Sequence, residues 1–298
     1  MRSAASASFF AQLLFNSLLW AMAFPLIRVI GEDLSPPALA AVRGVLGTLA
    51  LAVWVAGRRQ SLRPRGREWR DWIMLGLFEG AIPNILIAVS VARITTGLAS
   101  MIEASCPLMV AALAHFLFTD ERLGRRRLAG LLVGFAGMTI LLAPAAFADS
   151  SRSALGILAA VGAAVAYAIG NLYVRAIPSA DPARLALGQQ MFSGLPSLAL
   201  ALFLEGPAGF AHVPDHAAVL LAFGLFATAL PIVAYMHLLR EAGPTLGSMV
   251  GYLIPVWTIL AGTLLLGESV GTREILGGLV VLSGVAIVSF AKRRARPA

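Results

Sequence analysis

The sequence has little of what a water-soluble protein needs on its surface. Only 13% of its 298 residues are charged, whereas soluble domains have about 25%. One cysteine, Cys106, is too few for an intrachain disulfide, a cysteine-based zinc site or a haem-attachment motif. A GxxxxGK[ST] phosphate-binding motif is also missing, so this chain alone cannot pump a solute with ATP. Because 59% of the residues are hydrophobic, the chain belongs in a lipid bilayer.

Long apolar runs fill almost the whole chain. A helix needs about 20 apolar residues to cross about 30 Å of hydrocarbon, and ten runs of about this length can be distinguished. They cover residues 8–30, 36–57, 71–92, 95–118, 124–143, 153–175, 183–204, 215–240, 244–266 and 271–291. The one long polar loop is 58–70, so no soluble domain is expected. The sequence predicts an all-α integral membrane protein with ten transmembrane helices.

The basic residues predict how these helices are oriented. With a cytoplasmic N-terminus, eighteen of the 23 Lys and Arg residues fall on the cytoplasmic side, four fall outside and Arg43 lies within a span. The four on the outer side are Arg28, Arg93, Arg152 and Arg273. Cytoplasmic loops of membrane proteins carry the excess of Lys and Arg. We therefore expect both termini of the chain in the cytoplasm.

The two halves of the sequence match at a spacing of 147 or 148 residues. The matching pairs are Trp20 and Tyr167, Arg28 and Arg175, Pro83 and Pro231, Ser100-Met101 and Ser248-Met249, Pro107 and Pro255, Glu121 and Glu268, Gly130 and Gly277, and Gly137 and Gly284. Residues 1–147 and 148–298 are therefore predicted to be two five-helix repeats. Because five is odd, the second copy enters the membrane upside down, a plan of secondary transporters with a substrate site between the repeats. The first run could instead be a signal peptide cleaved after Ala21–Ala23, but its counterpart in the second half favours a retained helix.

Two glutamates end apolar runs at equivalent positions, Glu121 and Glu268. Each precedes a tight turn into a helix whose glycines permit close packing. A carboxylate costs little at the membrane surface, and the positive N-terminus of the following helix attracts it. We expect a structural role at a helical hairpin for both, with a direct role in transport as the alternative.

This combination of features resembles the drug/metabolite transporter superfamily, and its EamA-type branch most closely. The residues that carry the resemblance are Pro107, Glu121 and Gly130 in the first half and Pro255, Gly267-Glu268 and Gly277 in the second. The first copy has Thr119-Asp120-Glu121 where Gly-Glu is usual. By overall similarity the chain looks most like the YddG-type amino-acid exporters. The resemblance implies export of small metabolites across the bacterial inner membrane, through a central cavity lined by helices 1, 3, 4, 6, 8 and 9.

Polar and aromatic residues inside the apolar runs are the candidates for lining such a cavity, because these groups are costly in lipid. Asn16 and Trp20 lie four residues apart on one helix face, as do Tyr167 and Asn171. The alternative for each candidate is ordinary packing or an interfacial position. The expected cavity residues are Asn16, Trp20, Glu79, Asn84, Met101, Glu103, Tyr167, Asn171, Tyr235, Ser248, Tyr252 and Trp257.

Glu79 and Glu103 are the charged candidates inside the runs. Each could contact a substrate amine or carry a coupling proton. The structural alternative is a protonated carboxyl bonded to a neighbouring carbonyl or hydroxyl. Their counterparts in the second half are Ala227 and Gly251, so we expect an electrically asymmetric cavity. A buried cluster of cations, which phosphorylated substrates require, is missing, so zwitterionic or neutral substrates fit better.

The leading hypothesis is a secondary transporter that exports aromatic or hydrophobic amino acids and related metabolites by alternating access. Transport could be facilitative or coupled to protons. The alternative within transport is efflux of drugs or hydrophobic cations, which aromatic walls and a buried carboxylate also suit. An intramembrane enzyme or a scaffold is the alternative from another class. Of the four histidines only His212 and His216 have metal-ligand spacing, so no catalytic residue, metal or cofactor is expected, and no nucleic-acid partner. The oligomeric state is left open, and a monomer is compatible with the sequence.

Overall fold

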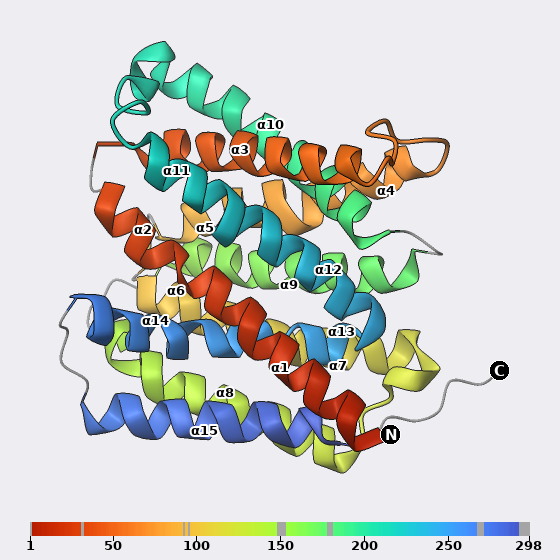
Figure 1. Cartoon of the computed structure of the whole chain (residues 1–298). Coiled ribbons are helices and arrows are strands. Elements are labelled where there is room, and N and C mark those ends of the chain that lie inside the picture. Colours follow the sequence, from red (N-terminus) through yellow and green to blue (C-terminus); the bar gives the residue numbers. More distant parts are fainter. Residues whose placement is uncertain are drawn as a thin grey trace. The chain divides into compact units, whose positions relative to one another are not determined.

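The computed structural model describes residues 2–30, 33–91, 93–94, 96–147, 153–177, 181–266 and 271–291. Within these ranges the chain forms helices and no strand (Figure 1), which confirms the prediction of an all-α protein. The elements are α1 (Arg2–Ala21), α2 (Ala23–Ile30), α3 (Pro36–Gly57), α4 (Glu68–Gly76), η1 (Leu77–Ala81), α5 (Ile82–Val91), α6 (Thr96–Glu103), α7 (Cys106–Leu117), η2 (Thr119–Glu121), α8 (Arg125–Phe147), α9 (Ala154–Ala176), α10 (Pro182–Glu205), η3 (Pro207–Phe210), α11 (Ala217–Gly224), η4 (Leu225–Ala229), α12 (Leu230–Glu241), α13 (Pro244–Gly247), α14 (Val250–Leu266) and α15 (Thr272–Ser289).

Eight stretches of the described chain are long and apolar enough to cross a membrane. They are Pro37–Gly57, Leu98–Leu117, Arg125–Ala143, Ala154–Ala176, Pro182–Glu205, Ala217–Glu241, Pro244–Ala261 and Thr272–Ser289. Two of the ten predicted runs are not among them. Among the described residues the first run contributes the shorter apolar helix Ser8–Ala21, which ends at a turn at Met22, and the third run holds the π-helix η1. A multi-pass membrane protein is thus confirmed, whereas a count of ten spans stays a prediction.

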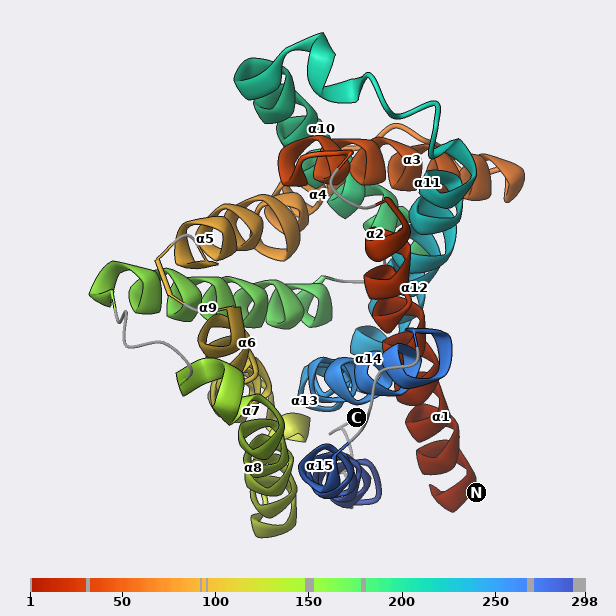
Figure 2. The same ribbon diagram turned by 90° about the vertical axis from the view of Figure 1, so that its left-hand side faces the viewer.

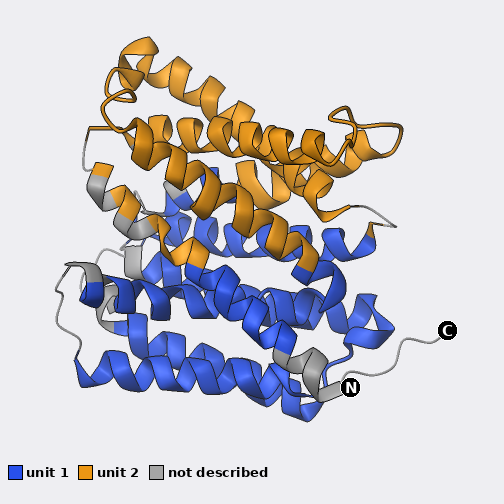
Figure 3. Ribbon diagram, in the orientation of Figure 1, with its two compact units in different colours: residues 1–18, 83–176, 238–298 blue, residues 19–82, 177–237 orange. Residues whose placement is uncertain are grey.

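The described chain divides into two compact units (Figure 3). The first unit comprises residues 1–18, 83–176 and 238–298, and the second comprises residues 19–82 and 177–237. Each unit takes segments from both halves of the sequence, so the compact units do not coincide with the sequence halves. Equivalent helices of the two halves are brought together inside each unit.

In the second unit, α3 and α10 lie side by side and antiparallel (Figures 1 and 2). They approach most closely at Gly44, where an added Cβ would lie 2.6 Å from Cα of Gly194. The N-cap of each helix is bonded to the far end of the other. Ser35 Oγ donates to the Glu205 carboxylate at 2.6 Å, and Asp181 accepts from Gln60 at 3.1 Å. Both caps precede a proline, which suits the first helical turn because it lacks an N–H.

In the first unit, α8 and α15 form a second antiparallel pair. An added Cβ at Gly130 would lie 2.9 Å from the carbonyl oxygen of Gly284, and one at Gly137 would lie 3.0 Å from that of Gly277. Small residues permit this close backbone approach between helices in lipid. The contact is reciprocal, because Gly130 matches Gly277 and Gly137 matches Gly284 in the sequence alignment of the halves.

Two π-helices interrupt the α-helical pattern of the second unit, η1 and η4. Each has five residues, and each ends two residues before a proline, Pro83 or Pro231. A proline has no N–H to donate to the preceding turn, and single-turn π-helices occur mostly inside longer helices at functional sites. The two begin at Leu77 and Leu225, which is the same spacing of 148 residues that relates the halves.

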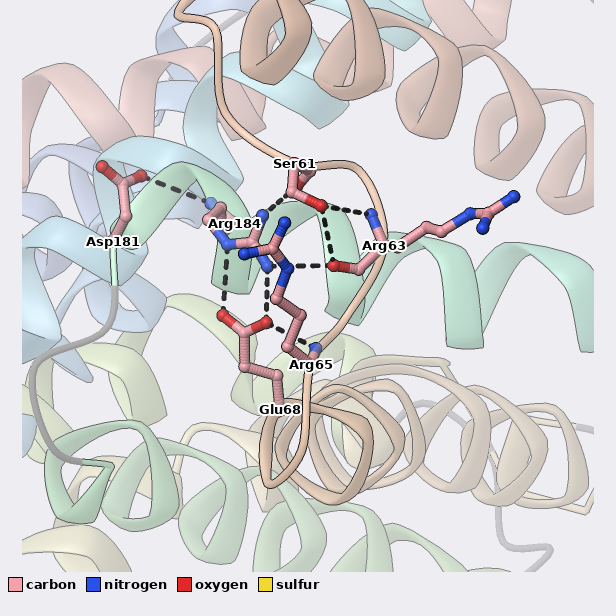
Figure 4. Close-up of polar contacts among 6 residues, drawn as sticks. All are labelled: Ser61, Arg63, Arg65, Glu68, Asp181 and Arg184. Carbon is pink, nitrogen blue, oxygen red and sulfur yellow. Dashed lines mark hydrogen bonds and ion pairs between the residues drawn. The ribbon is translucent and has the colours of Figure 1, made fainter.

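The polar loop 58–70, whose last three residues form the first turn of α4, is bonded to the start of α10 by Arg184 (Figure 4). Its guanidinium donates to the carbonyl oxygens of Ser61 and Arg63. It also donates to the two carboxylate oxygens of Glu68, at 3.2 and 2.5 Å. The same group lies 5.5 Å above the ring centre of Trp72. Together with the contacts of Gln60 and Arg58 to Asp181, Arg184 holds this loop against the start of α10.

Candidate functional site

Glu79 lies in η1, inside the second unit. Its side chain is 9% exposed, and its Oε1 has no hydrogen-bond partner among the described residues. In an α-helix the Glu79 carbonyl would accept from residue 83, but Pro83 has no N–H. The side-chain amide of Gln189 on α10 takes that place and donates to the Glu79 carbonyl oxygen at 3.2 Å. The Glu79 carbonyl thus accepts from a side chain of another helix, and Oε1 of its side chain is buried without a partner among the described residues.

Glu103 ends α6 in the first unit and has a similar setting. It is partly buried, and its Oε1 also has no partner among the described residues. Pro107, four residues later, cannot donate to the Glu103 carbonyl. Here the helix breaks at Ala104 and Ser105 before α7 begins. A glutamate four residues before a proline thus occurs at both mid-run carboxylates, a pattern visible in the sequence that the prediction did not use.

A second break lies at Ser248 and Met249, between α13 and α14. Ser248 is buried, and its hydroxyl donates to the Thr245 carbonyl oxygen at 3.2 Å. Discontinuous helices of this kind supply backbone groups to the substrate and ion sites of secondary transporters. Breaks in two helices of one unit, with Glu103 at the first and Ser248 at the second, mark the first unit as a place where such groups are presented.

Asn16 on α1 is the most isolated amide of the described chain. It is 1% exposed, and neither its oxygen nor its nitrogen has a partner among the described residues. The adjacent Ser17 accepts a hydrogen bond of 2.9 Å from Nε1 of Trp257, which ties α1 to α14 within the first unit. Trp257 therefore has a defined orientation, whereas the amide of Asn16 keeps a donor and an acceptor available for a ligand.

Tyr252 is held by contacts within the protein interior. It is completely buried, its ring lies against Gly134 of α8, and its hydroxyl donates to the Leu131 carbonyl oxygen at 3.5 Å. An added Cβ at Gly134 would lie 2.7 Å from the ring, so the glycine makes room for the tyrosine. This contact joins α14 to α8 inside the first unit.

Trp20 pairs with Tyr235 in the second unit. The ring centres are 5.0 Å apart and the planes meet at 63°, an edge-to-face arrangement. The sequence singled out both aromatics but did not predict that they touch. Tyr167, the repeat counterpart of Trp20, is a partly buried residue of α9 in the first unit.

The remaining predicted residues belong to the first unit. Asn171 is buried on α9, and Asn84 on α5 and Met101 on α6 are partly buried. The sequence analysis missed the buried glutamines Gln189 and Gln190 on α10. The available signal was their position within the apolar run 183–204, where a polar side chain has to find a partner.

Glu121 lies at the turn between α7 and α8, as predicted for a hairpin carboxylate. It is 1% exposed and forms an ion pair of 3.4 Å with Arg127. Its counterpart Glu268 lies outside the described residues. His212 and His216 bond to two different carboxylates, Asp215 at 3.1 Å and Asp33 at 2.8 Å. The turn carboxylate has a local partner, in contrast with Oε1 of Glu79 and of Glu103, which have none within the described part of the chain.

Comparison with known proteins gives a consistent result. A WAT1-related chloroplast protein of Arabidopsis thaliana is 27% identical over 91% of this chain and 67% of its own length. The uncharacterized inner membrane transporter YedA of Escherichia coli K12 is 25% identical over 92% of this chain and 88% of its own length. The uncharacterized transporter YvbV of Bacillus subtilis 168 is 25% identical over 93% of this chain and 90% of its own length.

A solved crystal structure, described only as that of a protein, has the same fold. Its TM-score is 0.80 over 94% of this chain and 96% of the other, at 21% identity. The model of the EamA-like transporter family matches twice, over residues 8–143 and again over 154–290. With eight stretches apolar enough to span a membrane and both halves matched by this model, the chain is a multi-pass membrane transporter that belongs to the EamA-like transporter family.

Proposed function

We propose that this transporter exports amino acids with aromatic or hydrophobic side chains, and related small metabolites, across the bacterial inner membrane. The observation that carries the proposal is the set of buried polar atoms of Asn16 and Glu103, both in the first unit, that have no partner among the described residues. Leaving such a group unpaired costs about 1–3 kcal/mol. Groups that the fold does not satisfy are suited to a ligand that brings the missing donors and acceptors.

An amino acid supplies the complementary groups. Its ammonium donates hydrogen bonds to the oxygens of Glu103 or Asn16, and its carboxylate accepts from the Asn16 amide. Both residues belong to the first unit. Trp257 donates a hydrogen bond to Ser17, the residue that follows Asn16 in the sequence, and this bond fixes its orientation. Its ring offers an apolar surface for an aromatic side chain. The YddG-type exporters, which the sequence resembles overall, are consistent with this substrate class.

Alternating access between two inverted five-helix repeats is the transport mechanism in this proposal. Three features support it: the family model matches each half once, the π-helices begin 148 residues apart at Leu77 and Leu225, and equivalent helices pack antiparallel as α3 with α10 and α8 with α15. Two copies of one segment that run antiparallel belong to repeats inserted in opposite directions. The distribution of Lys and Arg supports cytoplasmic termini.

Exchange in proteoliposomes tests the substrate class. Vesicles loaded with unlabelled phenylalanine should take up radiolabelled phenylalanine in a saturable way, and aromatic and hydrophobic amino acids should compete. Replacement Glu103→Gln should lower this exchange by about tenfold, since about 1.4 kcal/mol of binding is lost with the charge. The matched control is Glu121→Gln, another buried carboxyl that has its partner in Arg127; it should lower thermal stability and leave exchange by the folded protein unchanged.

The second candidate function, efflux of hydrophobic cations, is favoured by the Trp20–Tyr235 pair, which lies in the same unit as the Glu79 carboxyl. Tetraphenylphosphonium separates the two functions in the same vesicles. Transport of this cation without amino-acid exchange would establish the second candidate, and transport of neither would reject both.

A further inference from the structure

We propose that Glu79 and Gln189 form a proton-binding site that couples transport to a proton gradient. The proposal rests on the proposed function, because it names the ion that the exporter exchanges for its substrate. It also assigns different tasks to the two mid-run carboxylates. Glu103 in the first unit contacts the substrate, and Glu79 in the second unit carries the proton.

The two side chains are buried together at the crossing of η1 and α10. Glu79 is 9% exposed and Gln189 is 8% exposed, and Oε1 of each has no partner among the described residues. The 3.2 Å bond from Nε2 of Gln189 to the Glu79 carbonyl fixes the orientation of the amide, because the flipped amide would place two oxygens against each other. Oε1 of Gln189 is therefore an acceptor held in a fixed orientation on the helix that packs against η1.

This arrangement suits a carboxyl that alternates between two protonation states. An ionised carboxylate without a partner is strongly disfavoured in an apolar interior. A protonated carboxyl is a donor, and Oε1 of Gln189 is an acceptor on the helix that packs against it. The buried site thus accommodates the protonated form, and the ionised form requires contact with water. A change in the exposure of this site then binds or releases one proton.

Charged groups on the neighbouring elements are engaged elsewhere. The elements packed against η1 are α4 and α10. On α4, Glu68 bonds to Arg184 of α10, and Asp71 pairs with Arg70 at 3.2 Å. Asp71 is eight residues before Glu79, which is about 12 Å along a helix.

Arg43 on α3, which packs on α10, is also engaged elsewhere. Its guanidinium lies 5.7 Å above the ring centre of Phe223. Among the described residues Glu79 has no ion pair, so the proton is the charge that balances it.

The exchange balances one proton against one substrate molecule. A proton from the aqueous phase with the higher proton concentration adds to a carboxylate oxygen of Glu79. It leaves to water on the opposite side, while the substrate crosses in the other direction. No oxidant, nucleotide or metal ion is consumed.

Proteoliposomes containing the full chain test the coupling. Accumulation of radiolabelled phenylalanine is measured with the interior more acidic than the exterior, and exchange of phenylalanine is measured at equal pH. The wild-type protein should accumulate the amino acid, and a protonophore should abolish the accumulation. Glu79→Gln should keep the exchange rate within about twofold of the wild-type rate. Its accumulation ratio should be at least about tenfold lower, which corresponds to about 1.4 kcal/mol of lost driving energy.

Two adjacent glutamines provide a matched pair of variants. Gln189→Leu removes the acceptor for the protonated carboxyl, so accumulation should require an interior about one pH unit more acidic, the equivalent of one hydrogen bond. Gln190→Leu is the control, because Gln190 is also buried and also donates to a backbone carbonyl, that of Gly44 at 3.4 Å. It should change stability and leave the pH profile where it is in the wild type.

The possible failures are distinguishable. Exchange without pH-driven accumulation in the wild type, or undiminished accumulation in Glu79→Gln, overturns the proton site and leaves the proposed function intact. Absence of exchange for every amino acid rejects the proposed function. Infrared titration of the purified protein then decides the proton site without a substrate. A carboxyl C=O band that titrates with pH and is missing in Glu79→Gln supports the site, and a spectrum identical in both proteins overturns it.

Discussion

The second unit contains the same helix packing twice, once polar and once apolar. In the first interface α10 packs on α4 and η1, with Arg184 bonded to Glu68 and Gln189 bonded to the Glu79 carbonyl. In the second interface α3 packs on α11 and η4, without a carboxyl–glutamine pair in the described part of the chain, and its one charged contact noted above is that of Arg43 with the Phe223 ring. Leu46 lies against Gly224, and Gly47 lies against the methyl group of Thr228.

The difference lies in the side chains and not in the backbone. Both interfaces contain a five-residue π-helix followed by a proline, whether the helix holds Glu79 or Ala227. In the second interface the Thr228 hydroxyl donates to the Phe223 carbonyl oxygen of its own helix at 3.1 Å, so the turn needs no partner from α3. The comparison teaches that the proline-marked backbone is common to both copies, whereas the carboxyl and its glutamine are additions to one of them.

Replacing the glycine before each π-helix should have the largest effect on stability. An added Cβ at Gly76 would lie 2.2 Å from Cβ and 2.7 Å from the backbone carbonyl carbon of Phe192, whereas one at Gly224 would lie 2.6 Å and 3.4 Å from the same atoms of Leu46. Backbone yields less than a side chain, so Gly76→Ala should cost about 3 kcal/mol and Gly224→Ala about 1–2 kcal/mol. Thermal unfolding in detergent, followed by tryptophan fluorescence, measures both.

Gly57→Ala is the control for this pair, because nothing lies within 4 Å of an added Cβ there. It should change the unfolding free energy by less than about 0.5 kcal/mol. Equal losses for Gly76→Ala and Gly224→Ala would show that the two interfaces are packed alike, against the difference described above.

Removing Arg184 should give the next largest effect, and only in the polar interface. Arg184→Ala breaks the bonds to Glu68, to two loop carbonyls and to the Trp72 ring, at a cost of about 2 kcal/mol because Glu68 is partly exposed. The loop 58–70 should then be cut by trypsin about tenfold faster, as expected for about 1.4 kcal/mol of local opening. Arg184→Lys keeps the charge without the planar fork and should rescue less than half of the effect; full rescue would assign the effect to charge alone.

The cap of α10 should give the smallest effect, and this effect should depend on pH. Burial raises the pKa of Asp181, but the bonds from Gln60 and the Ala183 N–H and the charge of Arg58 together hold that pKa below its usual value. The carboxylate therefore stabilises the fold above about pH 4, the usual pKa of aspartate, and this contribution is lost as the pH falls below that value. Asp181→Asn keeps the cap and should cost about 0.3–0.5 kcal/mol at neutral pH.

Melting temperatures measured from neutral to acidic pH test this expectation. The gap between wild type and Asp181→Asn should close as the pH falls. A gap that widens in acid would contradict the sign derived for Asp181.

Much of the fold could be predicted because it follows from local chemistry. The starts of α3 and α10 are predicted by Ser35-Pro36 and Asp181-Pro182, where a capping side chain precedes a residue without an N–H. The apolar runs follow from the thickness of the bilayer. The turn at Met22 was not predicted, although Pro25 marks it in the sequence: a proline has no N–H to donate to the carbonyl of Ala21.

The candidate site was predicted in its residues and only in part in its contacts. Glu79, Glu103 and Asn16 stand out as polar residues in apolar runs, and the structure leaves atoms of all three without partners among the described residues. Gln189 was missed, because its importance depends on a carbonyl 110 residues away that Pro83 deprives of its usual donor. The edge-to-face contact of Trp20 with Tyr235 likewise depends on tertiary packing that no local pattern encodes.

Because Arg184 bonds α10 to loop 58–70, a movement of α10 is transmitted to the loop. A slide of this helix along its own axis has to drag the loop along or break the four hydrogen bonds that Arg184 donates. The side chain of Arg63 extends away from this cluster (Figure 4). A fluorophore attached at position 63 can therefore report the movement of α10 without replacing any side chain that bonds to Arg184.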